Sequence, residues 1–206
     1  MVTEHELVKL CRQGNREAQR ELYDRTSERI YRLLLRMTGN PDDAFDLAQD
    51  TYVKAFTRIE QFDGRSSVET WLYRVAVNEA LQHFRRAGRE RAKKRDLAPL
   101  NVAGTDHDAG DIRLDIRDAV DALSPSDRAI IFLRYQEGLD YRAIAQVCDC
   151  AAGTVASRLN RARREMRSHL QESYGLREVR RRGGHPKSEV RPAPKASLDD
   201  AQRGNA

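Results

Sequence analysis

The chain has 206 residues, of which 33% are charged and 6% aromatic, and 37 basic against 32 acidic side chains leave a net charge of +5. Its length suits one or two modest domains. No apolar stretch approaches the roughly 20 residues of a membrane-spanning helix, and the N-terminus has no signal-peptide core, so we expect no membrane insertion and a cytoplasmic location. The three cysteines, Cys11, Cys148 and Cys150, are too few for a disulfide framework or a zinc site, and we expect reduced thiols.

Residues 1–95 are predicted to form a first block of four helices. Helix-forming residues dominate the chain, and no run of alternating β-branched residues is long enough for a sheet, so the predicted class is all-α. Thr3 begins a capping pattern, and Gly39 ends the helical periodicity that follows. Asn40 then caps a third helix, and the turn-like segment at 62–67 separates it from a fourth.

Residues 112–172 are predicted to form a second, smaller helical block. Ser124 caps a helix that begins with Pro125, and Asp140 caps the short helix that follows it. A brief break then leads into an arginine-rich segment at 153–167, an arrangement that resembles a helix-turn-helix. The first of these helices has apolar residues at Ile130, Ile131, Leu133 and Tyr135.

Two segments lack apolar periodicity. Between the blocks, Gly, Pro and Asp are frequent at 96–111, which predicts a flexible acidic linker. Residues 173–206 hold hardly any large apolar group and many basic ones, so we expect a disordered basic C-terminal tail.

The segment 153–167, GTVASRLNRARREMR, places five arginines in fifteen positions with Glu165 as the only acid. At about 100° per residue, its apolar side chains cluster on one side and a cationic face remains on the other. Guanidinium groups suit phosphates and guanine edges, which favours nucleic acid as the partner. A solvated helix that only keeps the protein in solution is the alternative. The apolar stripe consists of Val155, Leu159, Ala162 and Met166.

Region 4 of the extracytoplasmic-function (ECF) group of the sigma-70 family resembles the segment LSPSDRAIIFLRYQEGLDYRAIAQVCDCAAGTVASRLNRARREM. The helix that these factors lay on the clamp coiled coil of RNA polymerase resembles NPDDAFDLAQDTYVKAF, and their −10 recognition segment resembles FDGRSSVETWLYRVAVNEALQHFRRAGR. The resemblance covers roughly residues 3–171 in the expected order. It implies a sigma region 2-like helical bundle and a region 4-like helix-turn-helix domain. The implied partners are core RNA polymerase (clamp and flap), promoter DNA, and an anti-sigma factor or other regulator.

The polymerase-binding residues implied by the resemblance are Asp46, Gln49 and Asp50. Their spacing of i, i+3 and i+4 puts them on one polar face of a helix. An ordinary solvated acidic face is the alternative. We expect the rest of this helix to be buried through Ala44, Leu47, Ala48 and Val53.

The resemblance also implies two sets of DNA-binding residues. Trp71, close in sequence to the residues implied for the −10 element, is expected in the core. For Asn78 the alternative role is to cap a helix or to satisfy a polar group in the core. Ala156 stands where relatives often have a basic residue, which removes a contact at the −35 element. The −10 set, a base-trapping loop with its following helix, is Asp63, Arg65, Ser66, Ser67, Val68, Asn78, Arg85, Arg86 and Arg89. The −35 set is Thr154, Ser157, Arg158, Arg161 and Arg164.

Two other functions compete with this interpretation. The chain could be a helix-turn-helix regulator that acts without polymerase. The segment DDAFD, which begins at Asp42, formally matches the magnesium–diphosphate motif of helical prenyl synthases, but its first acids are accounted for by the start of a helix. We find no catalytic constellation, so we expect no enzyme activity, no cofactor and no metal. The expected role is a sigma factor, associated with the nucleoid when bound to polymerase.

Overall fold

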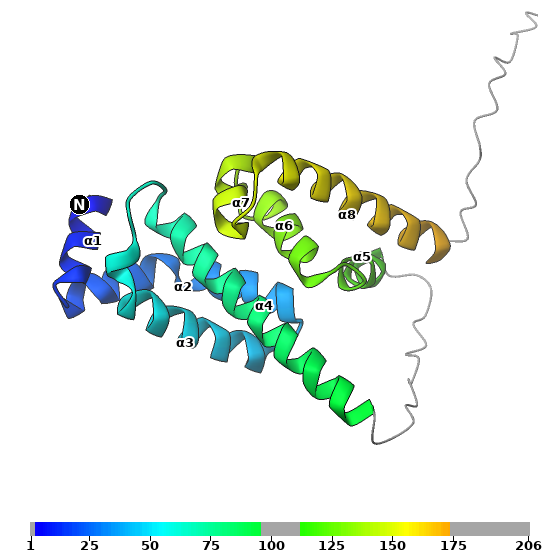
Figure 1. The fold of residues 1–206 in the computed structure, drawn as a ribbon, viewed down its shortest axis with the longest axis horizontal. Helices are drawn as coiled ribbons and strands as arrows, with labels where there is room; N and C mark the ends of the chain where they lie inside the picture. Colours follow the sequence, from blue (N-terminus) through cyan, green and yellow to red (C-terminus); the bar gives the residue numbers. More distant parts are fainter. Residues whose placement is uncertain (1–2, 96–111, 174–206) are drawn as a thin grey trace, which may run out of the picture. The chain divides into compact units, whose positions relative to one another are not determined.

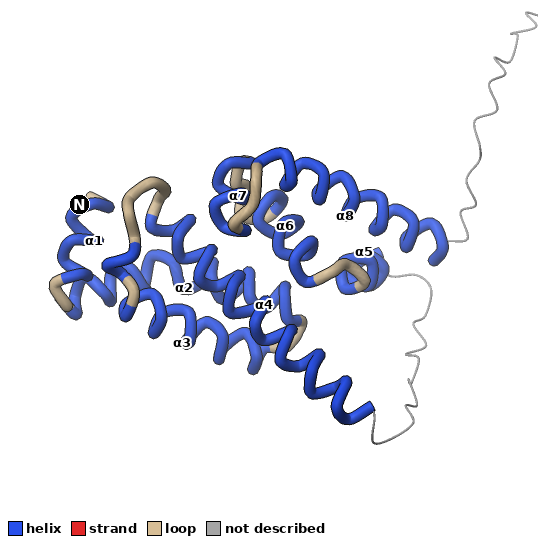
Figure 2. The backbone as a smooth tube through the Cα atoms, viewed as in Figure 1, coloured by secondary structure: helices blue, strands red, loops and turns tan. Residues whose placement is uncertain are grey.

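The computed structural model describes the backbone of residues 3–95 and 112–173, and the side chains of 3–90 and 115–171. Every regular element in this part of the chain is a helix, as Figure 2 shows, and the predicted all-α class is confirmed. All described residues fall in one compact unit. The predicted linker at 96–111 lies outside the described residues, as does the predicted tail beyond residue 173.

None of the described helices combines the length and the apolar character needed to cross a bilayer.

The first block contains four α-helices in chain order (Figure 1). The helix α2 packs against α1, α3 and α4, and α3 also packs against α4. Because a two-residue turn joins α2 to α3, these two helices run antiparallel. The elements are α1 (Glu4–Arg12), α2 (Arg16–Thr38), α3 (Pro41–Thr57), the short 3₁₀ helix η1 (Ile59–Gln61) and α4 (Val68–Arg95).

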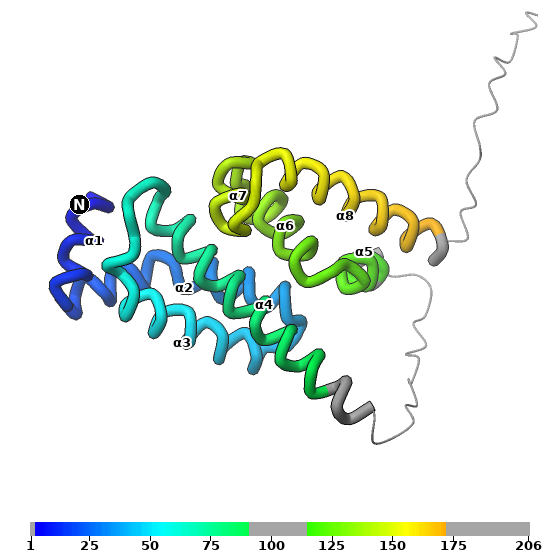
Figure 3. The backbone as a smooth tube through the Cα atoms, viewed as in Figure 1, coloured from blue at the N-terminus to red at the C-terminus, as the bar shows by residue number. Residues whose placement is uncertain are grey.

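The second block also contains four helices, which follow one another from green to orange in Figure 3. The long helix α8 packs against the three helices before it. Asp149, in a left-handed conformation with φ of 49°, ends α7 and starts the tight turn into α8. The elements are α5 (Ile112–Asp121), α6 (Pro125–Tyr135), α7 (Tyr141–Cys148) and α8 (Ala152–Ser173).

The helix starts predicted from capping residues are confirmed. The Thr3 hydroxyl accepts from the Glu6 N–H at 3.3 Å, and Asn40 Oδ1 accepts from the Asp42 N–H at 2.8 Å. Ser124 Oγ accepts from the Asp127 N–H at 3.1 Å. Asp140 Oδ1 accepts from the Ala143 N–H at 2.7 Å. Each cap satisfies a backbone donor that the helix itself leaves unpaired, which fixes where the helix begins.

Two residues expected in apolar stripes are exposed. Val53 on α3 is 65% exposed, so the prediction that it is buried was wrong. Tyr135, the last residue of the apolar pattern in α6, is 55% exposed. Each lies at the edge of its stripe, where the periodicity cannot show whether a neighbouring helix covers the side chain. Trp71 is 5% exposed and packs on Phe62, as expected for a core residue.

Glu137, just after α6, connects the second block to the first. Its side chain is 7% exposed, accepts from Arg29 Nε of α2 at 3.1 Å, and also accepts from the Tyr73 hydroxyl of α4. Burial raises the pKa of Tyr73 well above its usual range, and the hydrogen bond to Glu137 raises it further, so the hydroxyl stays protonated and donates. Arg29 also pairs with Glu69. One buried carboxylate therefore joins three helices.

Replacing Glu137 with alanine should lower the free energy of unfolding by about 1–3 kcal/mol. The buried Tyr73 hydroxyl would lose its acceptor, and Arg29 would lose one of its two carboxylates. Thermal unfolding followed by circular dichroism measures the change. Glu60→Ala is the control, because Glu60 is 72% exposed and should change stability by less than about 0.5 kcal/mol. Equal effects of the two variants would contradict the prediction.

Candidate nucleic-acid interface

The polar face of α3 lies in solvent. Asp46, Gln49 and Asp50 are all exposed, while Ala44 and Leu47 hold the opposite side of the helix in the core. The carboxylates of Asp46 and Asp50 have no ion-pair partner among the described residues. This face is therefore free to meet a partner surface, and it carries a net negative charge.

Apolar side chains border this acidic face, which the sequence patterns did not indicate. Phe45 is 57% exposed and Val53 is 65% exposed, and both lie on α3 beside the polar residues. Tyr23 on α2 is 46% exposed and packs edge-on against Tyr52 of α3. A surface of this composition, apolar with acids alongside, suits association with a protein better than a purely solvated face would. The spacing of Phe45, Gln49 and Val53 at i, i+4 and i+8 puts them on one face of α3, but it does not show that this face is exposed.

The loop between η1 and α4 is shaped by its own polar side chains. Asp63 Oδ1 accepts from the Arg65 N–H at 3.1 Å, and the two side chains pair at 3.2 Å. Gly64 has a φ of 74°, which a side chain would disfavour. Ser67 Oγ accepts from the Thr70 N–H at 3.1 Å and so caps α4. The loop is therefore a preformed turn whose tip, at residues 63–65, is exposed.

Two hydrogen bonds tie the ends of this loop to α1. Val68 is 4% exposed and its N–H donates to Glu4 Oε1 of α1 at 3.0 Å, so its side chain does not face solvent. Arg12 of α1 donates to the carbonyl of Phe62. These contacts fasten the loop to α1 and leave a hollow of about 520 Å³ between them. The hollow is lined by Glu4, His5, Val8, Arg12, Phe62, Asp63, Gly64 and Ser66.

Asn78 lies on an exposed face of α4 with no hydrogen-bond partner among the described residues, so it neither caps a helix nor satisfies a core group. It borders a hollow of about 230 Å³ between α3 and α4. Arg74 and Gln82, one turn before and after Asn78, line the same hollow, and the sequence reasoning missed both, although the i, i+4, i+8 spacing was visible. The remaining lining residues are Lys54, Arg58, Gln61, Trp71, Val75 and Glu79.

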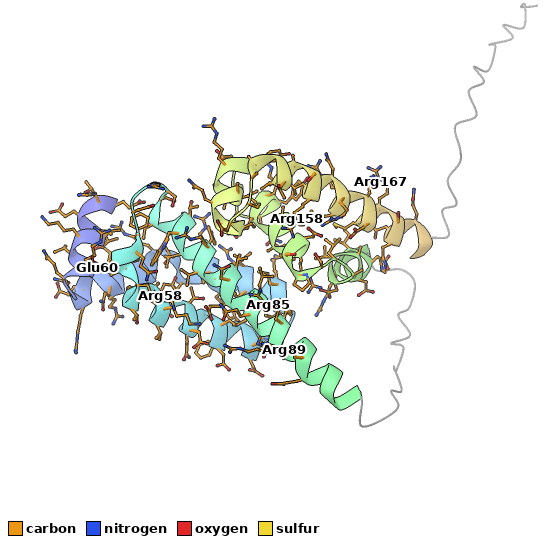
Figure 4. All side chains as sticks on the ribbon, viewed as in Figure 1. Arg58, Glu60, Arg85, Arg89, Arg158 and Arg167 are labelled. Carbon is orange, nitrogen blue, oxygen red and sulfur yellow. The ribbon has the colours of Figure 1, made fainter. Side chains whose placement is uncertain are left out.

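Beyond this hollow the exposed side of α4 is strongly cationic. Arg85, Arg86 and Arg89 are exposed and unpaired within the described part of the chain. Figure 4 shows Arg85 and Arg89 following one another along α4. The same helix thus presents guanidinium groups suited to phosphates and, one to two turns earlier, amides suited to base edges.

The arginines of α8 divide into held and free groups. Arg158 Nε donates to Asp127 Oδ1 at 2.7 Å and Arg161 donates to Asp127 Oδ2 at 2.8 Å. Arg163 Nε donates to the Tyr135 hydroxyl at 2.6 Å. Arg164 and Arg167 are exposed and have no ion-pair partner in the described residues. In Figure 4, Arg167 lies nearer than Arg158 to the C-terminal end of α8.

The remaining predicted residues of α8 lie where the helix meets solvent. Thr154 and Ser157 are exposed, and the Ser157 hydroxyl donates to the Thr154 carbonyl at 2.9 Å. With Arg161 and Arg164 they fall at i, i+3, i+7 and i+10, which is one face of a helix. The opposite stripe is buried at Val155, Leu159 and Ala162, as predicted.

No group of three potential metal ligands exists within the described residues. Asp42 and Asp43 lie in the first turn of α3, and the Asp43 carboxylate is 3.6 Å from His83. The acids of the DDAFD segment are thus placed as helix-start and surface residues.

Comparison with known proteins identifies the family. A family model described as Sigma-70 region 2 matches residues 22–90, and one described as Sigma-70, region 4 matches residues 113–166. The ECF RNA polymerase sigma-E factor of Haemophilus influenzae is 32% identical over 183 residues, which cover 82% of this chain and 96% of that protein. This chain belongs to the ECF sigma factors of the sigma-70 family.

Other relatives agree with this assignment. The ECF sigma factor SigE of Mycolicibacterium smegmatis is 35% identical over 156 residues, which cover 73% of this chain and 60% of that protein. Among solved structures, the sigma factor RpoE in complex with the anti-sigma factor NepR from Bartonella quintana is 29% identical, with a TM-score of 0.59. That match covers 76% of this chain and 96% of RpoE. The region 2 match includes α3 and most of α4, and the region 4 match includes α6, α7 and most of α8.

The carboxyl of Asp127 remains ionised in this sigma factor. Burial raises its pKa, but the hydrogen bonds from Arg161, Arg158 and Ser124 lower it by more, so the net pKa lies below the ordinary value. Since both oxygens accept from arginines and the side chain is only 3% exposed, the charge is compensated inside the protein.

We expect Asp127 to make the free energy of unfolding depend on pH in the acidic range. A carboxyl whose pKa is lower in the folded state stabilises the fold above its unfolded pKa of about 3.9, and that contribution disappears as pH falls through the folded value. Unfolding free energies measured by urea titration from neutral pH to about pH 3 should therefore fall less steeply for Asp127→Asn than for the wild type. Parallel curves for the two proteins would contradict this expectation.

Proposed function

We propose that this ECF sigma factor binds core RNA polymerase, directs it to promoters through the −10 and −35 elements, and helps to open the duplex. The observation that supports this most is the occurrence in one chain, in the expected order, of an exposed acidic face on α3 and a cationic helix in a helix-turn-helix. A DNA-binding regulator that acts alone would need the second feature but not the first.

The polymerase contact is proposed to involve Asp46, Gln49 and Asp50, with the clamp coiled coil as the partner. The carboxylates of Asp46 and Asp50 are exposed and unpaired within the described chain, so a basic partner can pair with them without first breaking an internal ion pair. The exposed Phe45 and Val53 add apolar area that association would bury. Contact with the flap is proposed for the second block.

Recognition of the −10 element is proposed for the loop at 63–67 and the hollow beside Asn78. Extruding a base costs a few kcal/mol, and stacking and edge hydrogen bonds in a preformed pocket offset that cost. The loop needs little reorganisation because its own hydrogen bonds already shape it. Arg85, Arg86 and Arg89 would bind backbone phosphates, which adds affinity without sequence preference.

Recognition of the −35 element is proposed for α8 in the major groove. Thr154, Ser157, Arg161 and Arg164 share the exposed face that a recognition helix presents to base edges and phosphates. Ala156 is half-buried and offers no polar group, so the preferred −35 sequence should differ from that of relatives with a basic residue there.

Regulation by an anti-sigma factor is proposed because RpoE of Bartonella quintana is bound to one in its solved structure. We further propose that the protein acts by binding, without catalysis, and that it works in the bacterial cytoplasm, on the nucleoid when bound to polymerase. These proposals follow from the family and from the partners just described.

Transcription in vitro tests the proposed function directly. Core RNA polymerase, the full chain and a library of genomic fragments should give transcripts that are absent without the chain, and their start sites should share −10 and −35 sequences. If the chain binds duplex DNA tightly by itself but neither joins core polymerase nor supports transcripts, it is a helix-turn-helix regulator and the proposal is wrong.

Reversing the charge of the α3 face should abolish polymerase binding. In the double variant Asp46→Arg with Asp50→Arg, like charges would face a basic partner, and association with core polymerase should weaken at least tenfold. Gel filtration or affinity co-purification measures the complex. Glu17→Arg, an exposed acid on α2, is the control and should bind normally. Normal binding by the double variant would exclude this face as the contact.

Removing the amide of Asn78 should weaken capture of the −10 strand. Because Asn78 is exposed and makes no internal hydrogen bond, Asn78→Ala should leave stability unchanged within about 0.5 kcal/mol. Open-complex formation, followed by permanganate footprinting, should fall several-fold. Gln13→Ala, at the exposed end of α1, supplies the matched amide control. An unchanged footprint for Asn78→Ala would assign the amide no role in melting.

A further inference from the structure

Asp127 is a buried acidic residue, with only 2% of its surface exposed. It lies in the first turn of α6, where Ser124 Oγ caps its N–H and also donates to its carboxylate at 2.9 Å. The two carboxylate oxygens point to α8, and each accepts from a different arginine of that helix. One residue thus connects the start of α6 to two successive turns of the recognition helix.

The two arginines differ in how far they remain available to DNA. The Arg158 side chain is 20% exposed, whereas that of Arg161 is 52% exposed and also lies 3.8 Å from Glu165. If Arg158 moved to a phosphate, the buried Asp127 carboxylate would lose one of its two arginine partners. Leaving a buried charge without its partner is strongly unfavourable. Arg161 can keep its bond to Asp127 and still present part of its guanidinium outward.

We propose that Asp127 is a positioning residue for promoter recognition. It withholds Arg158 from DNA and fixes Arg161 in one orientation, so the −35 element meets Thr154, Ser157, Arg161 and Arg164. Discrimination at the −35 element then depends on a residue that never touches DNA. This inference rests on the proposed promoter-binding function.

The salt dependence of DNA binding distinguishes an arginine that binds phosphate from one that does not. Each phosphate contact contributes about 0.9 to the slope of log K against log salt concentration. With the full chain and a short duplex, Arg164→Ala should lower the slope by about one, and Arg158→Ala, on the same helix, should leave it unchanged. An equal decrease for both variants would show that Arg158 binds DNA and would overturn the proposal.

A second experiment tests the effect on specificity. In holoenzyme transcription from a promoter obtained with the fragment library, the ratio of transcript from the intact to the scrambled −35 element should fall about tenfold for Asp127→Asn, because both guanidinium groups become free to bind any phosphate. Glu165→Gln removes the exposed acid beside Arg161 with the same change of charge, and it should keep the wild-type ratio.

The possible outcomes distinguish a failure of the proposed function from a failure of the positioning role. If the wild type transcribes neither template, the proposed function fails. If the wild type discriminates and a folded Asp127→Asn variant discriminates equally well, the positioning role fails. If Asp127→Asn does not fold, as thermal unfolding would show, the comparison of Arg158→Ala with Arg164→Ala decides the matter.

Discussion

The burial of one face of α2 is the interaction on which the packing of α1, α3, α4 and α6 depends. Ile30, Leu33, Leu34 and Met37 are fully buried, and α2 packs against α1, α3, α4 and α6. Fully burying an aliphatic side chain of this size contributes about 1.5–3 kcal/mol. Because this apolar contact holds the helices together, the outward faces of α3 and α4 need no internal partners, and their acids, amides and guanidinium groups remain available to other molecules.

Local signals in the sequence predict the helices well, because capping and apolar spacing act within a few residues. Asn40 and Asp140 begin their helices as expected, and the buried stripe of α8 lies where its spacing placed it. The exposure of Val53 and Tyr135 could not be predicted, since it depends on which helix from a distant part of the chain packs beside them. Periodicity defines a stripe but not its borders.

The same distinction between local and long-range contacts applies to the candidate site. The acidic face of α3 and the cationic face of α8 follow from spacing within one helix. The pairing of Asp127 with Arg158 joins residues 31 apart in sequence, and nothing near either residue indicates it. Asp127 is visible in the sequence only as a favourable first-turn acid. Arg74 and Gln82 could have been found from their spacing to Asn78, but only the structure shows that a hollow lies between them and α3.

The bond between Asp127 and α8 also limits how the recognition helix can be exchanged among relatives. A graft of α8 into a sigma factor that has no acid at the start of its equivalent of α6 would bring Arg158 and Arg161 without the carboxylate that neutralises them. In such a recipient, a working chimera must transfer the start of α6 together with α8. For promoter engineering, the transferable module is this pair of distant segments, and the helix by itself is an incomplete part.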